Sequence, residues 1–189
     1  MNAPISPLST SDDRSLDALF APKSVAIIGA SSDQRRFGGR PIQYLLEAGF
    51  EGGIYPVNPM RDEIQGLKAF KSINDVPGPV DLAMLAVGSD VTQQTVEDCI
   101  ARGVKAAICY GAGFAEVGGE GEVRQAKLVQ TAREGGLRLR APNFTAHSPR
   151  RWKMACPKPD ALRSPASLAA MAAICCATCF CGASVCRSG

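Results

Sequence analysis

Cysteine is scarce over most of this 189-residue chain. Only Cys99 and Cys109 lie in the first 143 residues, whereas six cysteines stand in the last 46. Those six are Cys156, Cys175, Cys176, Cys179, Cys181 and Cys186. We therefore do not expect residues 1–143 to form a secreted scaffold held together by disulfides.

Three further absences narrow the function. Residues 1–14 lack the positive start and apolar run of a signal peptide, so we expect a cytoplasmic protein. Residues 1–143 contain no uninterrupted apolar span, so a membrane helix is not expected there. Their net charge is −2 with acids and bases interleaved, so no basic surface for nucleic acid is indicated.

What the chain does contain is an alternation of short apolar runs and helical patterns. The predicted strands are 24–28, 53–57, 81–87, 105–110 and 137–139, and the predicted helices are 41–49, 91–102 and 122–134. Apolar strands separated by helices are typical of parallel β-α-β units. We expect a Rossmann-like doubly wound parallel sheet of order 3-2-1-4-5 over residues 16–143, after a disordered segment 1–15.

In such a sheet the ligand lies over the carboxyl ends of the strands. The first loop there offers backbone N–H groups, hydroxyls and a cation before a helix, which together suit a phosphate group. Its candidate binding residues are Gly29, Ala30, Ser31, Ser32, Arg36 and Gly38. An ordinary glycine turn with solvated arginines is the competing interpretation.

The loops after the next two strands are less specific. The second loop contributes Asn58, Pro59 and Arg61. These residues form either a rigid turn or one wall of a nucleotide site. In the second case the Arg61 guanidinium could bind a phosphate group. The third loop contributes Ala86, Val87 and Gly88, which either approach a ligand closely or cap the next helix.

An NAD-dependent dehydrogenase is disfavoured by two features of these loops. The G-x-G-x-x-G fingerprint is absent, because Ser31 stands where its second glycine would be. No acid ends the second strand to hold a ribose hydroxyl, since Val57, Asn58 and Pro59 stand there.

Taken together, the motifs resemble the CoA-binding domain of NDP-forming acyl-CoA synthetases, relatives of the succinyl-CoA ligase α subunit. The resemblance covers about residues 16–143 in unbroken order. The residues that carry it are Leu19 to Ser31, Pro56 to Pro59, Gly66, the strand at Asp81, Gly111 to Glu116, and Leu137 to Asn143.

The resemblance implies a domain that holds coenzyme A. The pyrophosphate would lie at Gly29 to Ser32 and Arg36, and the nucleotide near Asn58 to Arg61. The loops at Ala86 to Gly88 and around Gly113 would line the path of the pantetheine thiol of CoA toward the reaction centre. Complete ligases of this family also use a phosphorylated histidine on a following domain and an ATP-grasp module, and neither pattern is found in this sequence.

The family pattern ends after Asn143. The single histidine, His147, lacks the family's phosphohistidine context, so we expect no catalytic residue in this chain. Residues 144–189 are rich in Ala, Ser, Pro, Arg and Cys and carry a net charge of +5. We interpret them as an irregular tail, from another reading frame or a divergent end. A zinc site and a membrane helix over 164–185 are weaker alternatives.

Three hypotheses follow. The first is a CoA-binding module related to NDP-forming acyl-CoA synthetases, truncated and without ligase activity of its own. The second is a working ligase subunit that acts with a separate ATP-grasp chain. The third is an NAD- or nucleotide-binding regulator, against which the lack of a DNA-binding motif before the first strand argues.

Overall fold

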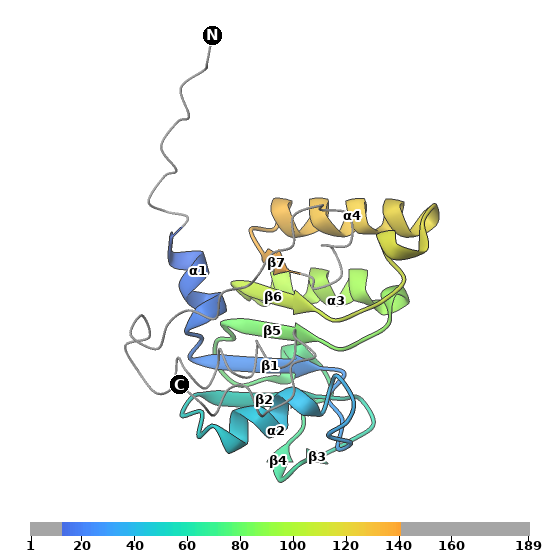
Figure 1. The fold of residues 1–189 in the computed structure, drawn as a ribbon. Helices are drawn as coiled ribbons and strands as arrows, with labels where there is room; N and C mark the ends of the chain where they lie inside the picture. Colours follow the sequence, from blue (N-terminus) through green and yellow to red (C-terminus); the bar gives the residue numbers. More distant parts are fainter. Residues whose placement is uncertain (1–12, 141–189) are drawn as a thin grey trace, which may run out of the picture.

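The computed structural model describes residues 13–140 (Figure 1). The predictions for residues 1–12, His147 and the cysteine-rich tail lie outside the described residues. The helices are α1 (Asp13–Phe20), α2 (Arg40–Glu47), α3 (Ser89–Ala101) and α4 (Glu120–Glu134). The strands are β1 (Ser24–Ile28), β2 (Gly53–Val57), β3 (Glu63–Ile64), β4 (Leu67–Lys68), β5 (Leu82–Leu85), β6 (Ala106–Cys109) and β7 (Arg138–Arg140).

The main sheet has five strands in the order β2-β1-β5-β6-β7, and all of its pairs are parallel. The Rossmann-like parallel sheet is therefore confirmed. The predicted strand order of 3-2-1-4-5 is wrong, because the third long strand, β5, pairs with β1 and not with β2. The chain goes from β1 to β2 on one side of β1 and then crosses to β5 on the other side. The topological switch point of the sheet therefore lies between β1 and β5.

Pro56 lies in β2, the edge strand of the main sheet in the part of the chain that the structure describes, and only a single bridge to Phe70 is formed on its outer side there. In a parallel strand the N–H and C=O of one residue point to the same side, and the Pro56 carbonyl accepts a hydrogen bond from Phe70 N at 2.9 Å. The missing Pro56 N–H therefore lies on the outer edge, away from β1. Proline is tolerated at such an edge and would leave a neighbouring strand without a donor.

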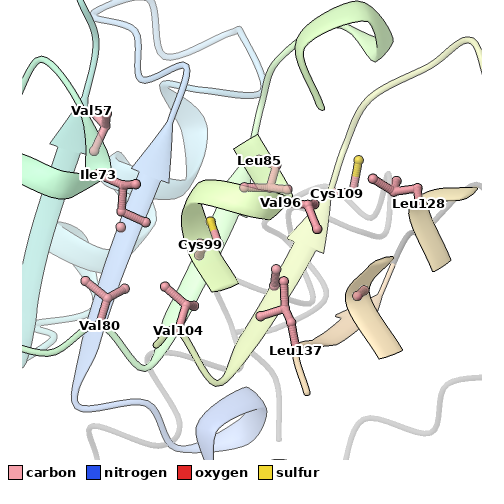
Figure 2. Packing of buried hydrophobic residues seen from close by; sticks show 14 of the residues in the cluster. Val57, Ile73, Val80, Leu85, Val96, Cys99, Val104, Cys109, Leu128 and Leu137 are labelled. Atoms are coloured by element: carbon pink, nitrogen blue, oxygen red, sulfur yellow. The ribbon is translucent and has the colours of Figure 1, made fainter. Parts of the chain in front are cut away.

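Helices cover both faces of the sheet. On one face α1 and α2 contribute Leu19, Ile42 and Leu45, which pack with Val25 and Ile27 of β1. On the other face α3 and α4 pack against alternate residues of β5 and β6 (Figure 2). That second cluster includes Leu85, Val96, Cys99, Val104, Cys109, Leu128 and Leu137. Burial on both faces explains why these strands read as continuous apolar runs.

Two elements of the fold, one at its start and one between β2 and β5, were not predicted. Helix α1 begins at Asp13, so the last three residues of the segment expected to be disordered are helical. The connection from β2 to β5 contains a hairpin, β3–β4, whose two-residue strands are too short to show a period-2 pattern. None of the helices between residues 13 and 140 combines the length and the apolar character that a membrane span needs.

Candidate functional site

The first loop leaves the sheet through Gly29, which has φ of +81°. A side chain at this position would collide with the carbonyl oxygen of Ala86 after β5. The N–H groups of Gly29 and Ala30 both donate to the Val57 carbonyl at the end of β2, at 3.0 and 3.1 Å. The loop is thus held between the carboxyl ends of β2 and β5, and a glycine is required where it begins.

Most N–H groups of the first loop are already used inside the protein. Ser31 N donates to Gly38 O at 3.2 Å, and Asp33 N donates to Ser31 Oγ at 3.1 Å. Within the described residues, the N–H groups of Ser32, Gln34, Phe37 and Gly38 have no hydrogen-bond partner. The expectation that the loop offers the amides of Gly29, Ala30 and Ser31 to a phosphate is therefore wrong, because Gly29 and Ala30 donate to Val57 O and Ser31 donates to Gly38 O.

Two arginines flank the carboxylate of Asp33. Arg35 Nε lies 3.3 Å and Arg36 Nε 3.7 Å from its oxygens, while the two arginine side chains remain 92% and 76% exposed. The backbone N–H of Arg35 and the arginine charges lower the pKa of Asp33 below its ordinary value. Asp33 is therefore ionised at neutral pH and gathers two cations that a phosphate group can approach.

Asn58 fastens the second loop to the first. Its Nδ2 donates to Ala30 O at 2.8 Å, and its Oδ1 accepts from Met60 N at 2.8 Å. Arg61 follows on the same loop, and its exposed guanidinium has no partner among residues 13–140. Asn58 therefore acts mainly on the shape of the loop, whereas Arg61 is available to an anion.

A cavity of about 930 Å³ opens between these two loops. It is lined by Gly29, Ala30, Ser31, Ser32, Asp33, Arg35, Arg36, Phe37, Gly38, Asn58, Arg61 and Ala86. Its volume lies in the range of small-molecule sites, and three of its side chains are cationic against a single acid. Of the predicted site residues, Pro59, Val87, Gly88 and Gly113 are not in this lining.

Three lining residues, Asp33, Arg35 and Phe37, were not among the predicted site residues, and Phe37 is the one apolar side chain of the three. Its ring is 51% exposed and stacks on Tyr110, which follows β6, with ring centroids 6.1 Å apart and planes 15° from parallel. The buried Tyr110 hydroxyl has no hydrogen-bond partner among residues 13–140, and burial raises the pKa of that group above its ordinary value. A large apolar side chain in an otherwise polar loop was the signal that could have indicated Phe37.

The loops after β5 and β6 meet each other beside a second, smaller cavity. A Cβ on Gly113 would lie 2.7 Å from Ser89 Oγ, so these loops are in close contact. The smaller cavity has a volume of about 220 Å³ and is lined by Ser89, Asp90, Gln93, Phe114, Arg124, Lys127 and Leu128. The roles predicted for Gly88 and Gly113 in ligand binding stay predictions.

The site has no built-in metal centre in the part of the chain that the structure describes. Among residues 13–140 no group of three or more His, Cys, Asp or Glu side chains is placed to hold a metal ion. The chemistry that the large cavity offers is anion recognition by guanidinium groups and unpaired backbone N–H groups.

Comparison with known proteins gives a consistent result. Residues 23–147 match the family described as a CoA binding domain. The chain is 41% identical over 129 residues to the alpha subunit of the ADP-forming acetate–CoA ligase II of Pyrococcus furiosus. That match covers 68% of this chain but only 28% of the relative, so the chain spans less than a third of its length.

Two solved structures share the fold. An acetyl-coenzyme A synthetase 1 of Ca. Korarchaeum cryptofilum, solved with phosphate and ADP, is 40% identical with a TM-score of 0.62. The match covers 66% of this chain and 26% of that one. A hypothetical protein from Pyrococcus horikoshii is 28% identical with a TM-score of 0.54, covering 75% of this chain and 89% of the other. The fold thus occurs both as part of large ligases and as nearly a whole chain.

Proposed function

The chain belongs to the CoA binding domain family, and we propose that it binds coenzyme A in the cavity between the loops after β1 and β2. One observation carries the proposal. The cavity brings Arg35, Arg36 and Arg61 together with unpaired N–H groups of the first loop. Coenzyme A carries a pyrophosphate and a 3′-phosphate, which guanidinium groups and backbone N–H groups recognise.

The residues around the cavity fit this ligand better than they fit NAD. The position at the end of β2 holds Asn58, whose amide is tied to Ala30 O and Met60 N. A carboxylate that could hold a ribose 2′-hydroxyl is therefore missing from this position. We assign the pyrophosphate to Ser32 and Arg36 and the 3′-phosphate to Arg61. In this assignment CoA is a bound substrate or ligand of the module.

Calorimetric titration of the whole chain tests the proposal. CoA should bind more tightly than dephospho-CoA, because the latter lacks the group assigned to Arg61, and NAD should bind most weakly. NAD binding equal to or tighter than CoA binding would overturn the proposal and favour the nicotinamide-binding regulator. A CoA affinity that does not change between low and high salt would also contradict a site built on guanidinium–phosphate contacts.

We further propose that residues 16–143 form the binding module, which does not make acyl-CoA by itself and is cytoplasmic. The described residues supply an anion site but no histidine, since His147 lies outside them. Incubation of the chain with ATP, CoA and acetate should give no acetyl-CoA. Stoichiometric phosphorylation of His147 by a nucleotide would contradict this.

The relatives named as alpha subunits favour a second candidate, a subunit that acts with an ATP-grasp chain. In that case this chain would hold CoA, and the partner chain would supply the part of the reaction that uses ATP. Addition of an ATP-grasp subunit of an ADP-forming acetate–CoA ligase would then produce acetyl-CoA only when both chains are present. Absence of product with both chains supports the binding module alone.

A further inference from the structure

The hairpin β3–β4 carries an unusual residue at its tip. Its two-residue turn consists of Gln65 and Gly66, whose φ angles are 51° and 80°. Turns with two positive φ angles favour Asn, Asp and Gly, and a longer side chain is disfavoured there. Gln65 is the single non-glycine residue with positive φ among residues 13–140. The turn by itself therefore gives no reason for a glutamine at this position.

The side chain of Gln65 supplies that reason. Its Nε2 donates to Ser31 O at 3.1 Å and to Gly39 O at 2.9 Å. An amide NH2 has two hydrogens, and here each has one carbonyl acceptor. The reverse orientation of the amide would place its oxygen against two carbonyl oxygens, so the contacts define the orientation.

These two acceptors lie at opposite ends of the turn in the first loop. Ser31 N also donates to Gly38 O at 3.2 Å, so the backbone and Gln65 together close residues 31–39 into a ring. Gln65 is half-buried and does not line the large cavity, so it acts on the loop from outside the site.

We propose that Gln65 is a positioning residue that sets the shape of the loop 29–39 and thereby the affinity of the cavity for phosphate groups. The affinity part of this inference rests on the proposed function, whereas the effect on the loop does not. The proposal explains why a residue poorly suited to the turn stands at its tip, since a side chain one methylene shorter could not reach both carbonyls.

The variant Gln65→Asn separates this role from a merely structural one. Asparagine suits the turn better than glutamine but is too short to bridge the loop, so the better turn should offset part of the stability lost with the two hydrogen bonds, and affinity is measured well below the unfolding midpoint of both proteins. The dissociation constant for CoA should nevertheless rise about tenfold, because a binding loop loses two hydrogen bonds that hold it. The matched control is Gln94→Asn on α3, whose exposed side chain donates to Asp98 Oδ1 at 3.1 Å and should leave affinity unchanged.

Hydrogen exchange of the free protein tests the loop without any ligand. The amides of Ser31, Arg36 and Gly39, which are bonded within the loop, should exchange at least several-fold faster in Gln65→Asn, while those of α3 keep their rates. Unchanged loop exchange together with unchanged CoA affinity would overturn the proposal. If the wild-type chain fails to bind CoA, the proposed function fails and the affinity part fails with it, while faster loop exchange would still support the effect on the loop.

Discussion

Asn58 Nδ2 donates a hydrogen bond to the carbonyl oxygen of Ala30 at 2.8 Å, and this contact joins the loops after β1 and β2. Residues of both loops line the large cavity, and Ala30 and Asn58 are both among them. The width of the cavity therefore depends on Asn58, which holds the two loops together, as well as on the side chains that contact a ligand.

Replacing Asn58 by aspartate removes this donor and keeps the oxygen that accepts from Met60 N. We expect the dissociation constant for CoA to rise at least about tenfold, because the loops lose their link and the cavity gains a negative charge. Calorimetry measures the change. Asn74→Asp, on an exposed side chain away from the cavity, is the control, and equal losses in the two variants would refute a role for the Ala30 contact.

Arg36→Ala and Arg61→Ala test the two phosphate assignments separately. Each should weaken CoA binding by about 1.5 to 3 kcal/mol if its guanidinium makes a charge-assisted bond to phosphate. Arg61→Ala should leave dephospho-CoA binding unchanged, whereas Arg36→Ala should weaken the binding of both ligands. Arg133→Ala, on the last turn of α4, is the control. No change at either position would contradict the assignments.

Asp33→Asn should strengthen CoA binding about two- to fivefold at low salt, because it removes the one acid of the cavity lining. The amide oxygen can still accept from the Arg35 N–H, so the turn should keep its shape. Titrations at two salt concentrations check the effect, which should shrink as salt is raised. Asp62→Asn, at an exposed acid outside the cavity, serves as the control. Weaker CoA binding in Asp33→Asn would show that Asp33 is needed to hold the arginines.

Asp81 should control stability at the opposite end of the sheet. Its carboxylate accepts from Lys105 Nζ at 2.6 Å and from Lys23 N at 2.9 Å, which joins the segments before β1, β5 and β6. Burial by itself raises the pKa of Asp81, but these hydrogen bonds outweigh burial and lower the pKa below its ordinary value of 3.8.

A folded-state pKa below the unfolded one stabilises the protein above the ordinary carboxyl pKa, and this contribution is lost as pH falls through the folded value. Asp81→Ala should therefore lose about 1 to 3 kcal/mol of unfolding free energy at pH 7. Denaturant titrations should show the gap to wild type narrowing below about pH 4. Asp62→Ala, at the exposed pair with Lys71, should scarcely change the midpoint. A gap that widens on acidification would contradict this account of Asp81.

The order of strands shows where sequence patterns reach their limit. Apolar runs identified β1, β5 and β6, because strands buried on both faces need apolar side chains throughout. The signal was weaker for the half-buried edge strands β2 and β7, and β7 carries two arginines. The position of β5 beside β1 was not predicted, although Pro56 is a local signal that β2 forms an edge. Its meaning became clear only when the structure placed the missing N–H on the outer side of β2, where Phe70 lies.

The sequence by itself determined the kinds of elements, the glycine that ends β1, and the residue types that meet at the carboxyl ends of the strands. These depend on local properties: side-chain polarity, backbone freedom at Gly29 and the spacing of apolar residues. Only the tertiary structure decided which N–H groups of the first loop are free, and that Phe37 stacks on Tyr110 and Gln65 spans Ser31 and Gly39. Those contacts join residues 26 to 73 positions apart, and no periodic pattern in a chain encodes which distant carbonyl or ring a side chain will meet.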